Sequence, residues 1–174
     1  MTQPCEIVQL GAKILRQHAE IVEHVGSPDI RQIITDMQAA LAATQGVGLA
    51  APQISQLKRI IIVASRPTTR YPTAPLMEPT VMINPVFDAL SDEKEKDWEG
   101  CLSILGIRAL VPRYKNIRVQ YTDEQGRNID IKLEGFIARV FQHETDHLEG
   151  KIYLDRVESP EDIISESEYF KLLS

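Results

Sequence analysis

Two histidines near the C-terminal end of the chain have the spacing of metal ligands on a helix. They lie in His143-Glu144-Thr145-Asp146-His147, and residues four apart project from the same helical face. Two imidazoles at this spacing can hold one transition-metal ion, and Glu144 can take a proton from a water on that ion. The motif also arises by chance, so a surface helix that carries two histidines is the alternative at this point.

The segment around these histidines has the hydrophobic period of a buried helix. Apolar residues recur at helical spacing from Phe136 to Leu148, and Gly150 follows where helices commonly end. We therefore expect a core helix with its histidines directed inwards, where they need a further ligand from elsewhere in the chain.

A catalytic metal site takes three protein ligands and leaves one position open. Cys101 is the best third candidate, because a thiolate binds borderline-soft divalent ions strongly. A lone cysteine is otherwise most often a small buried apolar residue. The other histidines, His18 and His24, lie in a segment without a supporting pattern, and we interpret them as surface or structural residues.

The elements that must position these residues are helices and several strands. Ser27-Pro28-Asp29 is typical of a helix start, and apolar residues at helical spacing extend that helix over residues 28–44. The remaining expectations are strands at 59–64, 80–84 and 152–154, a hairpin of 117–121 with 129–133, and a solvated turn at 91–96. This order predicts an α+β fold, with antiparallel β-sheets packed around the central C-terminal helix and the N-terminal helix packed outside.

Length and composition indicate one domain, residues 1–174, with an acidic tail at 158–174 that can form an amphipathic helix. The net charge of −6 argues against DNA binding, and the longest apolar run, residues 60–64, is too short to span a membrane. Two cysteines are too few for a disulfide framework, and residues 1–6 lack the features of a signal peptide. We expect a cytoplasmic protein and a monomer.

Three stretches of the chain together resemble the signature motifs of the peptide deformylase family, and they occur in that family's order. They are residues 46–53 (GVGLAAPQ), 99–103 (EGCLS) and 143–147 (HETDH). Residues 108–113 and 146–150 also resemble segments of bacterial members. The resemblance implies a hydrolase that removes the formyl group from N-formyl-methionyl peptides of nascent proteins and releases formate.

The same resemblance implies one metal ion per chain, usually Fe²⁺, with Zn²⁺ or Ni²⁺ as common replacements. The metal ligands would be Cys101, His143 and His147, and Glu144 would be the general base that activates a metal-bound water. The oxyanion that forms at the formyl carbon would accept hydrogen bonds from the Gln53 side-chain amide and the Leu102 backbone N–H.

The resemblance also implies that the peptide binds as an added strand, where small residues allow the backbones to approach closely. The residues assigned to substrate binding are Val47, Gly48, Glu99, Gly100, Arg108, Phe136, Arg139 and Val140. Val47, Phe136 and Val140 are the expected walls of the methionine pocket, although Phe136 suits core packing equally well. Arg113 would form a salt bridge with Glu99 that braces the site.

Two positions depart from the usual pattern of the family. Ser55 stands where most members have glycine, and Leu105 stands where most have proline. Neither residue is a ligand or a catalytic group. The departures therefore leave the chemistry in place and bear on loop shape and peptide preference.

Two other functions remain open alongside the deformylase. A zinc endopeptidase would use the same helix and a further downstream ligand, for which Glu158 and Glu161 are available in the polar tail. A catalytically silent metal-binding or interaction module would lack the base or the oxyanion donor, yet Glu144 and Gln53 are both present. Formylated N-termini emerge from ribosomes, so transient ribosome contact is also implied, and the acidic tail is expected to weaken it.

Overall fold

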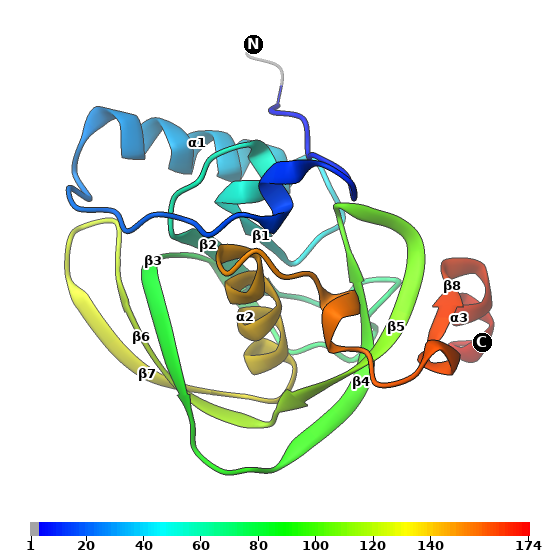
Figure 1. The fold of residues 1–174 in the computed structure, drawn as a ribbon. Coiled ribbons are helices and arrows are strands. Elements are labelled where there is room, and N and C mark those ends of the chain that lie inside the picture. The colour runs from blue at the N-terminus through cyan, green and yellow to red at the C-terminus, as the bar shows by residue number, and fades with distance from the viewer. Residues whose placement is uncertain (1–3) are drawn as a thin grey trace.

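Helix α2 (Gly135–Leu148) lies at the centre of the molecule, with strands around it and helix α1 (Pro28–Ala42) on the outside (Figure 1). The computed structural model describes residues 4–174. Residues 1–3, which belong to the expected single domain 1–174, lie outside the described residues. The α+β fold with antiparallel sheets around the C-terminal helix is confirmed.

The larger sheet has five antiparallel strands in the order β1-β2-β3-β6-β7. Their bounds are Gly48–Ala50, Ile60–Ser65, Met77–Ala89, Asn116–Thr122 and Asn128–Glu134. Every residue of β2 is buried, because Ile60 and Ile62 pack in the cluster of α1 while Ile61 and Val63 pack in the cluster of α2. This sheet is therefore the layer between the two helices, and its β6–β7 pair is the hairpin expected from the sequence.

Helix α1 begins where its sequence predicts, since the Ser27 hydroxyl accepts a hydrogen bond from the Ile30 N–H and Pro28 is the first helical residue.

The strand expected at residues 80–84 is longer than predicted. It was expected to end before Pro85, but β3 continues to Ala89. Asn84 has φ +51° and the pairing with β6 shifts register between Ile83 and Val86. At such a bulge the ladder is already interrupted, so proline removes no ladder hydrogen bond.

The smaller sheet contains β4 (Lys94–Cys101), β5 (Ile104–Tyr114) and β8 (Ile163–Ser165), in that order. The solvated turn expected at 91–96 is only partly correct, because its last three residues begin β4. These charged residues are exposed at a sheet edge, where charge discourages pairing with other chains. Strands β4 and β5 join through two residues, so Cys101 lies at the closed end of this hairpin.

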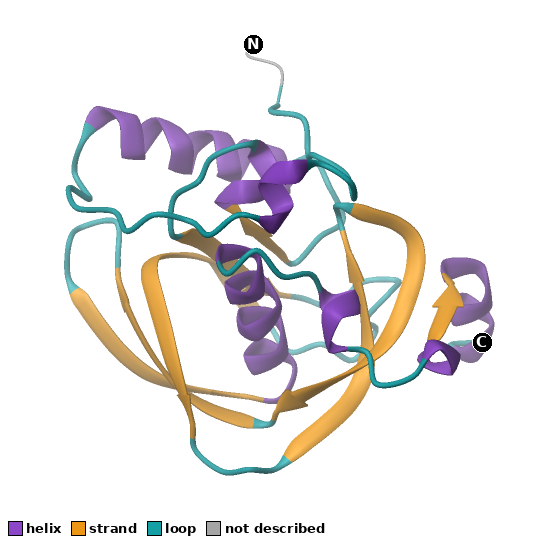
Figure 2. Cartoon of the chain, viewed as in Figure 1, coloured by secondary structure: helices purple, strands orange, loops and turns teal. Residues whose placement is uncertain are grey.

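The C-terminal part of the chain differs most from expectation (Figure 2). The strand expected at 152–154 is instead the start of a 3-10 helix, η3 (Tyr153–Arg156), where the Asp155 carboxylate accepts a hydrogen bond from the Ile152 N–H. The tail is not one helix: η4 (Pro160–Asp162) and β8 precede α3 (Glu166–Leu172). The short 3-10 helices η1 (Lys13–Arg16) and η2 (Ala51–Ile54) complete the elements described. Among residues 4–174, no helix is both long enough and apolar enough to cross a membrane.

Candidate metal centre

Helix α2 and the closed end of the β4–β5 hairpin bring the three expected ligands together. The ligand atoms of Cys101, His143 and His147 all lie within 4.8 Å of one another, and Cys101 Sγ is 3.4 Å from His147 Nε2. Ligands at 2.0–2.3 Å around a tetrahedral ion are about 3.5 Å apart, so this spacing suits one ion. His18 and His24 are exposed and do not belong to this group.

The electrostatics of the three residues also fit a metal ion. Burial alone would raise the pKa of the Cys101 thiol, but the charges and hydrogen bonds of His147 and His143 lower it to about 5. Within the described part of the chain, the buried Glu144 Oε2 and His147 Nδ1 have no hydrogen-bond partner. Burial raises the pKa of Glu144 to about 7, against the opposing effect of the two histidines. A buried carboxylate oxygen without a partner, beside a thiolate and two imidazoles, is suited to hold a proton during a reaction.

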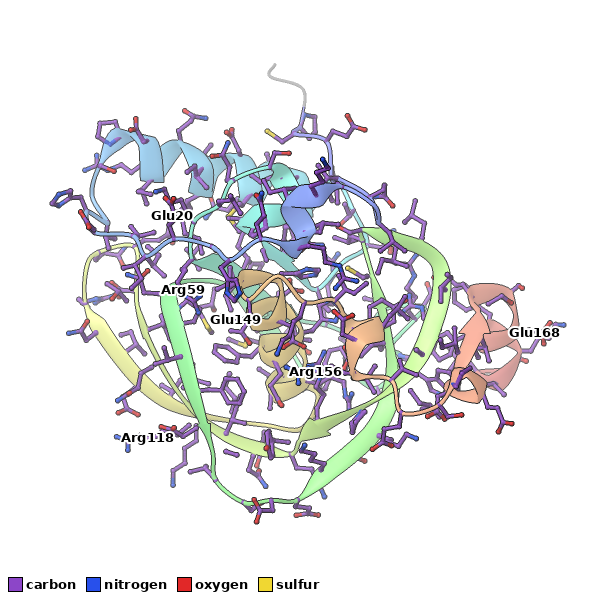
Figure 3. All side chains as sticks on the ribbon, in the orientation of Figure 1. Glu20, Arg59, Arg118, Glu149, Arg156 and Glu168 are labelled. Carbon is purple, nitrogen blue, oxygen red and sulfur yellow. The ribbon has the colours of Figure 1, made fainter. Side chains whose placement is uncertain are left out.

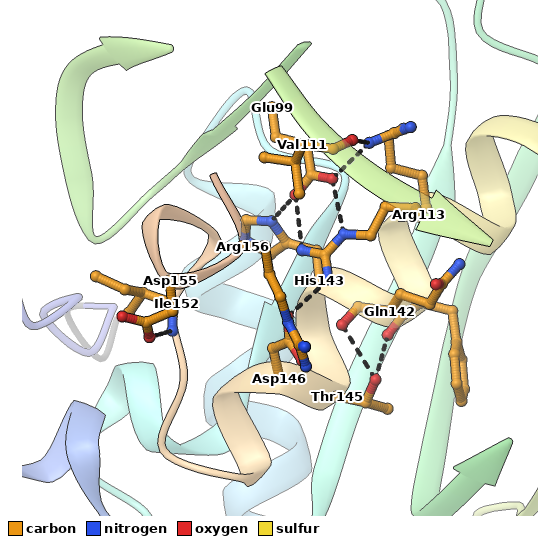
Figure 4. A network of polar contacts seen from close by, with 12 residues as sticks. Glu99, Val111, Arg113, Gln142, His143, Thr145, Asp146, Ile152, Asp155 and Arg156 are labelled. Atoms are coloured by element: carbon orange, nitrogen blue, oxygen red, sulfur yellow. Dashed lines mark hydrogen bonds and ion pairs between the residues drawn. The ribbon is translucent and has the colours of Figure 1, made fainter. Parts of the chain in front are cut away.

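A buried ionic network orients the first histidine (Figure 4). His143 Nδ1 lies 2.8 Å from Glu99 Oε1, which leaves Nε2 of the same ring for a metal. The Glu99 carboxylate also accepts hydrogen bonds from Arg113 Nε at 2.9 Å and from Arg139 Nη1 at 2.8 Å. Burial opposes ionisation of Glu99, but Arg113 and His143 outweigh it and hold the pKa of this carboxyl well below its usual range. The ion pair expected between Glu99 and Arg113 is therefore present.

The network continues along α2 to the surface. Arg113 Nη1 donates to Asp146 Oδ2 at 2.6 Å, and Arg156 Nη2 donates to Asp146 Oδ1 at 2.8 Å. Asp146 can therefore be buried on α2 although it is charged, because both of its carboxylate oxygens are paired. A ligand-bearing helix held in this way has little freedom to move its histidines.

One expected oxyanion donor, Gln53, contacts Cys101, and the other, Leu102, is its neighbour in the chain. Gln53 Oε1 accepts a hydrogen bond from the Ala50 N–H at 2.9 Å, so the amide nitrogen faces Cys101 Sγ at 3.6 Å and Ser103 Oγ at 3.1 Å. Leu102 follows Cys101 directly, and its carbonyl accepts a hydrogen bond from Gln9 Nε2 at 3.0 Å. The donor face of Gln53 is thus fixed toward the thiolate by the backbone of β1.

Two glycines of the motifs also leave space for side chains of this protein. A Cβ on Gly48 would lie 2.9 Å from Cγ and Cδ of Glu144, and one on Gly100 would lie 2.5 Å from Cζ of Arg108. The absent side chains therefore leave space for two side chains of this protein. Ser55 has φ +65°, a conformation that glycine adopts without strain, so the departure from the family pattern falls on a left-handed residue.

A cavity of about 380 Å³ opens beside the thiolate and Glu144. All eight residues that we expect to bind substrate line it: Val47, Gly48, Glu99, Gly100, Arg108, Phe136, Arg139 and Val140. The exposed Leu105 lines it too. Arg70, Tyr71 and Glu166 also line the cavity. No pattern in the sequence predicted them, because the first two lie in an irregular loop and the third lies in the tail.

The downstream acids do not extend the metal site. Glu158 pairs with Lys96 at 3.1 Å, and neither Glu158 nor Glu161 belongs to the group of possible ligands. One cysteine and two histidines provide three ligands and leave a coordination position open, and Glu144 lies next to His143 in the chain. This arrangement is typical of a metal-dependent hydrolase. The additional downstream ligand that a zinc endopeptidase would use is therefore missing from the site. The site is that of a metal-dependent hydrolase in which a cysteine is the third ligand.

The particular family follows from comparison with known proteins. A model of the polypeptide deformylase family matches residues 4–162, and the chain belongs to that family. Members are metal-dependent enzymes that remove the N-formyl group from nascent peptides, and this chain is an enzyme of that kind. The family and the activity expected from the three motifs are confirmed.

Similar proteins cover almost the whole chain. Peptide deformylase 2 of Nostoc sp. is 51% identical over 168 residues, which are 97% of this chain and 94% of the relative. Peptide deformylase 1 of Bordetella pertussis is 46% identical over 151 residues, 87% of this chain and 86% of the relative. A Met-Ala-Ser-bound class I type b peptide deformylase from Acinetobacter baumannii has a TM-score of 0.86 at 39% identity, covering 90% of this chain and 100% of that one.

Proposed function

We propose that deformylation takes place at Cys101, His143 and His147, which hold one Fe²⁺ ion, with Zn²⁺ or Ni²⁺ able to replace it. The observation that carries this proposal is the convergence of one thiolate and two imidazoles beside the cavity. This donor set suits all three metals. When bound, such an ion supplies Lewis acidity, which makes water a stronger acid and stabilises negative charge on a carbonyl oxygen.

Glu144 moves the proton in this proposal. Its unpartnered Oε2 accepts a proton from the attacking water and then gives it to the nitrogen of the departing amine. The side chain is buried on α2 against Gly48, so its position is set before substrate binds. Burial also keeps competing water away from the carboxyl group.

Gln53 and Leu102 stabilise the oxyanion in this proposal. The Gln53 Nε2 group and the Leu102 backbone N–H donate to the formyl oxygen as it gains negative charge. The fixed orientation of the Gln53 amide supports this role, because a preorganised donor needs no rearrangement during the reaction. Removal of one such donor typically costs about 3 kcal/mol of transition-state stabilisation.

The formyl-methionyl peptide binds as an extended strand between the two sheets in this proposal. Strand β1 is the outermost strand of the larger sheet and β4 is the outermost strand of the smaller one, and both border the cavity. Backbone groups of Val47, Gly48 and Gly100 would pair with the peptide, as in other strand additions to a free sheet edge. Val47, Phe136 and Val140 would enclose the methionine side chain, with Phe136 also packed on Tyr71.

The remaining proposals concern the protein as a whole. We propose that Glu99, Arg113 and Arg139 position His143, and that residues 1–174 form a single catalytic domain that acts as a cytoplasmic monomer. Contact with ribosomes would be transient and weak. Several acids of the tail pair with cations of the chain itself, as Asp162 does with Lys96, and Lys171 is the only basic residue among residues 158–174, so the tail offers little positive charge to RNA. Salt-sensitive cosedimentation with ribosomes at submicromolar affinity would contradict this view.

The test is anaerobic release of formate from a formyl-Met-Ala-Ser peptide by protein loaded with Fe²⁺ or Ni²⁺. Glu144→Gln, which keeps the shape of the side chain, is expected to lower kcat by about 10²–10⁴-fold. Its metal content should remain at one ion per chain, because Glu144 is not a ligand. A variant with near wild-type turnover would exclude Glu144 as the proton carrier, and loss of the metal would place it among the ligands.

A further inference from the structure

One residue that lines the cavity belongs to a segment that follows the part matched by the family model. The match ends at residue 162, and β8 and α3 come after it. Glu166, the first residue of α3, lines the same cavity as Glu144. The C-terminal segment thus adds a carboxylate to the wall of the substrate cavity.

This segment is held firmly against the rest of the protein (Figure 1). Strand β8 pairs with β5, where Ser165 lies opposite Ile107. The buried Tyr169 donates from its hydroxyl to the Arg70 carbonyl at 2.7 Å, and its ring lies 5.8 Å from the Trp98 ring. Glu166 therefore has a defined place at the cavity and is not part of a loose tail.

Glu166 bridges two arginines of the cavity wall. Its Oε2 accepts hydrogen bonds from Nε and Nη2 of Arg108, both at 3.2 Å, and its Oε1 accepts one from Arg70 Nη2 at 3.2 Å. The Arg108 side chain is 3% exposed, whereas those of Glu166 and Arg70 are 24% and 29% exposed. Glu166 and Arg70 are thus the members of this cluster that a bound peptide can approach most closely.

We propose that Glu166 is a specificity-determining residue that sets how the enzyme responds to charge in the peptide after methionine. Its carboxylate offsets one of two positive charges at the wall, so it disfavours acidic side chains and favours basic ones. Without it, Arg70 and Arg108 would attract a peptide carboxylate. The inference rests on the proposed function, since it takes this cavity as the place where the peptide binds.

The test compares kcat/KM for formyl-Met-X-Ala-amide and formyl-Met-Ala-X-amide, with X as Asp, Asn or Lys. Glu166→Gln is expected to raise the ratio of the Asp to the Lys peptide roughly tenfold in at least one series at low salt. The shift should shrink in about 1 M salt, where charges several ångströms apart are screened. Glu166→Asp, which keeps the charge, should stay within about twofold of the wild-type ratio.

The matched control is Glu168→Gln, on the same helix. Figure 3 shows Glu168 on the outer side of α3, where it pairs with Lys171, and it does not line the cavity. The same loss of charge there should leave both ratios unchanged. The proposal would be overturned if Glu166→Gln left the Asp-to-Lys ratio unchanged in both series. It would also be overturned if Glu166→Asp or Glu168→Gln shifted the ratio as much as Glu166→Gln does.

Failure of the proposed function can be told apart from failure of this inference. Absence of wild-type turnover of the Asn peptides would count against the catalytic assignments and would say nothing about charge selectivity. In that case the same Asp-to-Lys ratio is measured as dissociation constants of the formyl peptides by calorimetry. A ratio of dissociation constants that Glu166→Gln leaves unchanged would then overturn the inference.

Discussion

Two networks of arginines and carboxylates border the same cavity, and they differ mainly in burial. In the first, Glu99 contacts Arg113, Arg139 and His143, and these side chains are at most 9% exposed. In the second, Glu166 joins Arg70 and Arg108 at the cavity wall, where the carboxylate is partly open to solvent. The first network contacts His143, a proposed metal ligand, whereas the second joins Glu166 to Arg70 and Arg108.

The difference in burial indicates which function each network can serve. A buried charge that loses its partner cannot be solvated, so every member of the first network depends on the others. Water and salt can replace the partner of a partly exposed charge, so the second network tolerates change. A rigid network suits the placement of His143, and a tolerant one suits the adjustment of substrate preference.

The largest effect on stability is expected from Glu99→Gln. The substitution leaves the buried Arg113 and Arg139 without their shared anion, and breaking a buried ion pair typically costs about 3–5 kcal/mol. Urea unfolding of the metal-free protein measures this change in the free energy of unfolding. Metal affinity should also fall by about 10–100-fold, because His143 loses the group that orients it. A loss of stability below about 1 kcal/mol would show that burial does not separate the two networks as described.

An intermediate effect, on the turnover rate kcat, is expected from Gly48→Ala. The added Cβ would meet the Glu144 carboxylate, and a displacement of a catalytic group by about 1 Å can cost about 100-fold in rate. We expect kcat for the formyl peptide to fall by about 10–100-fold while the metal is retained.

The matched control for this variant is Gly26→Ala, where the nearest atom to the new Cβ is Arg31 Nη2 at 3.7 Å, an ordinary contact. Activity should remain at the wild-type level in that variant. Equal losses in both variants would indicate a general effect of alanine on the backbone, unrelated to Glu144.

The smallest effect on stability is expected when an ion pair whose partners are both well exposed is removed. Arg118 on β6 contacts Asp130 at 2.6 Å, and Figure 3 shows Arg118 at the surface, far from α2. Solvent screens this pair, so Arg118→Gln should produce no measurable shift in the midpoint of thermal unfolding. A clear shift would mean that pairing, independent of burial, stabilises this protein.

The sequence predicted the central part of the site because its signals are local or strongly periodic. The helical period around His143 and His147 fixed the face on which they lie, and Cys101 was the only other soft ligand with a suitable context. The buried strand after Arg59 was equally clear from its run of β-branched residues. For the helix and the strand, the pattern of neighbouring residues is enough to predict the element.

The C-terminal segment could not be predicted, because contacts with distant residues determine it. Ile163 and Ile164 fit a helical face by spacing, yet they pair with β5 as strand β8. The place of Glu166 depends on Arg108 and Arg70, which lie 58 and 96 positions earlier in the chain. No periodicity in the tail carries information about these partners.

The most direct test of the account is the spectrum of the cobalt-substituted protein, because a thiolate ligand adds a charge-transfer band to it. One Co²⁺ per chain should bind, with this band present in the wild type and in Glu144→Gln. The band should disappear in Cys101→Ser and persist in Cys5→Ser, since Cys5 is exposed and outside the ligand group. A band that survives Cys101→Ser would contradict the assignment of Cys101, and with it the metal centre described above.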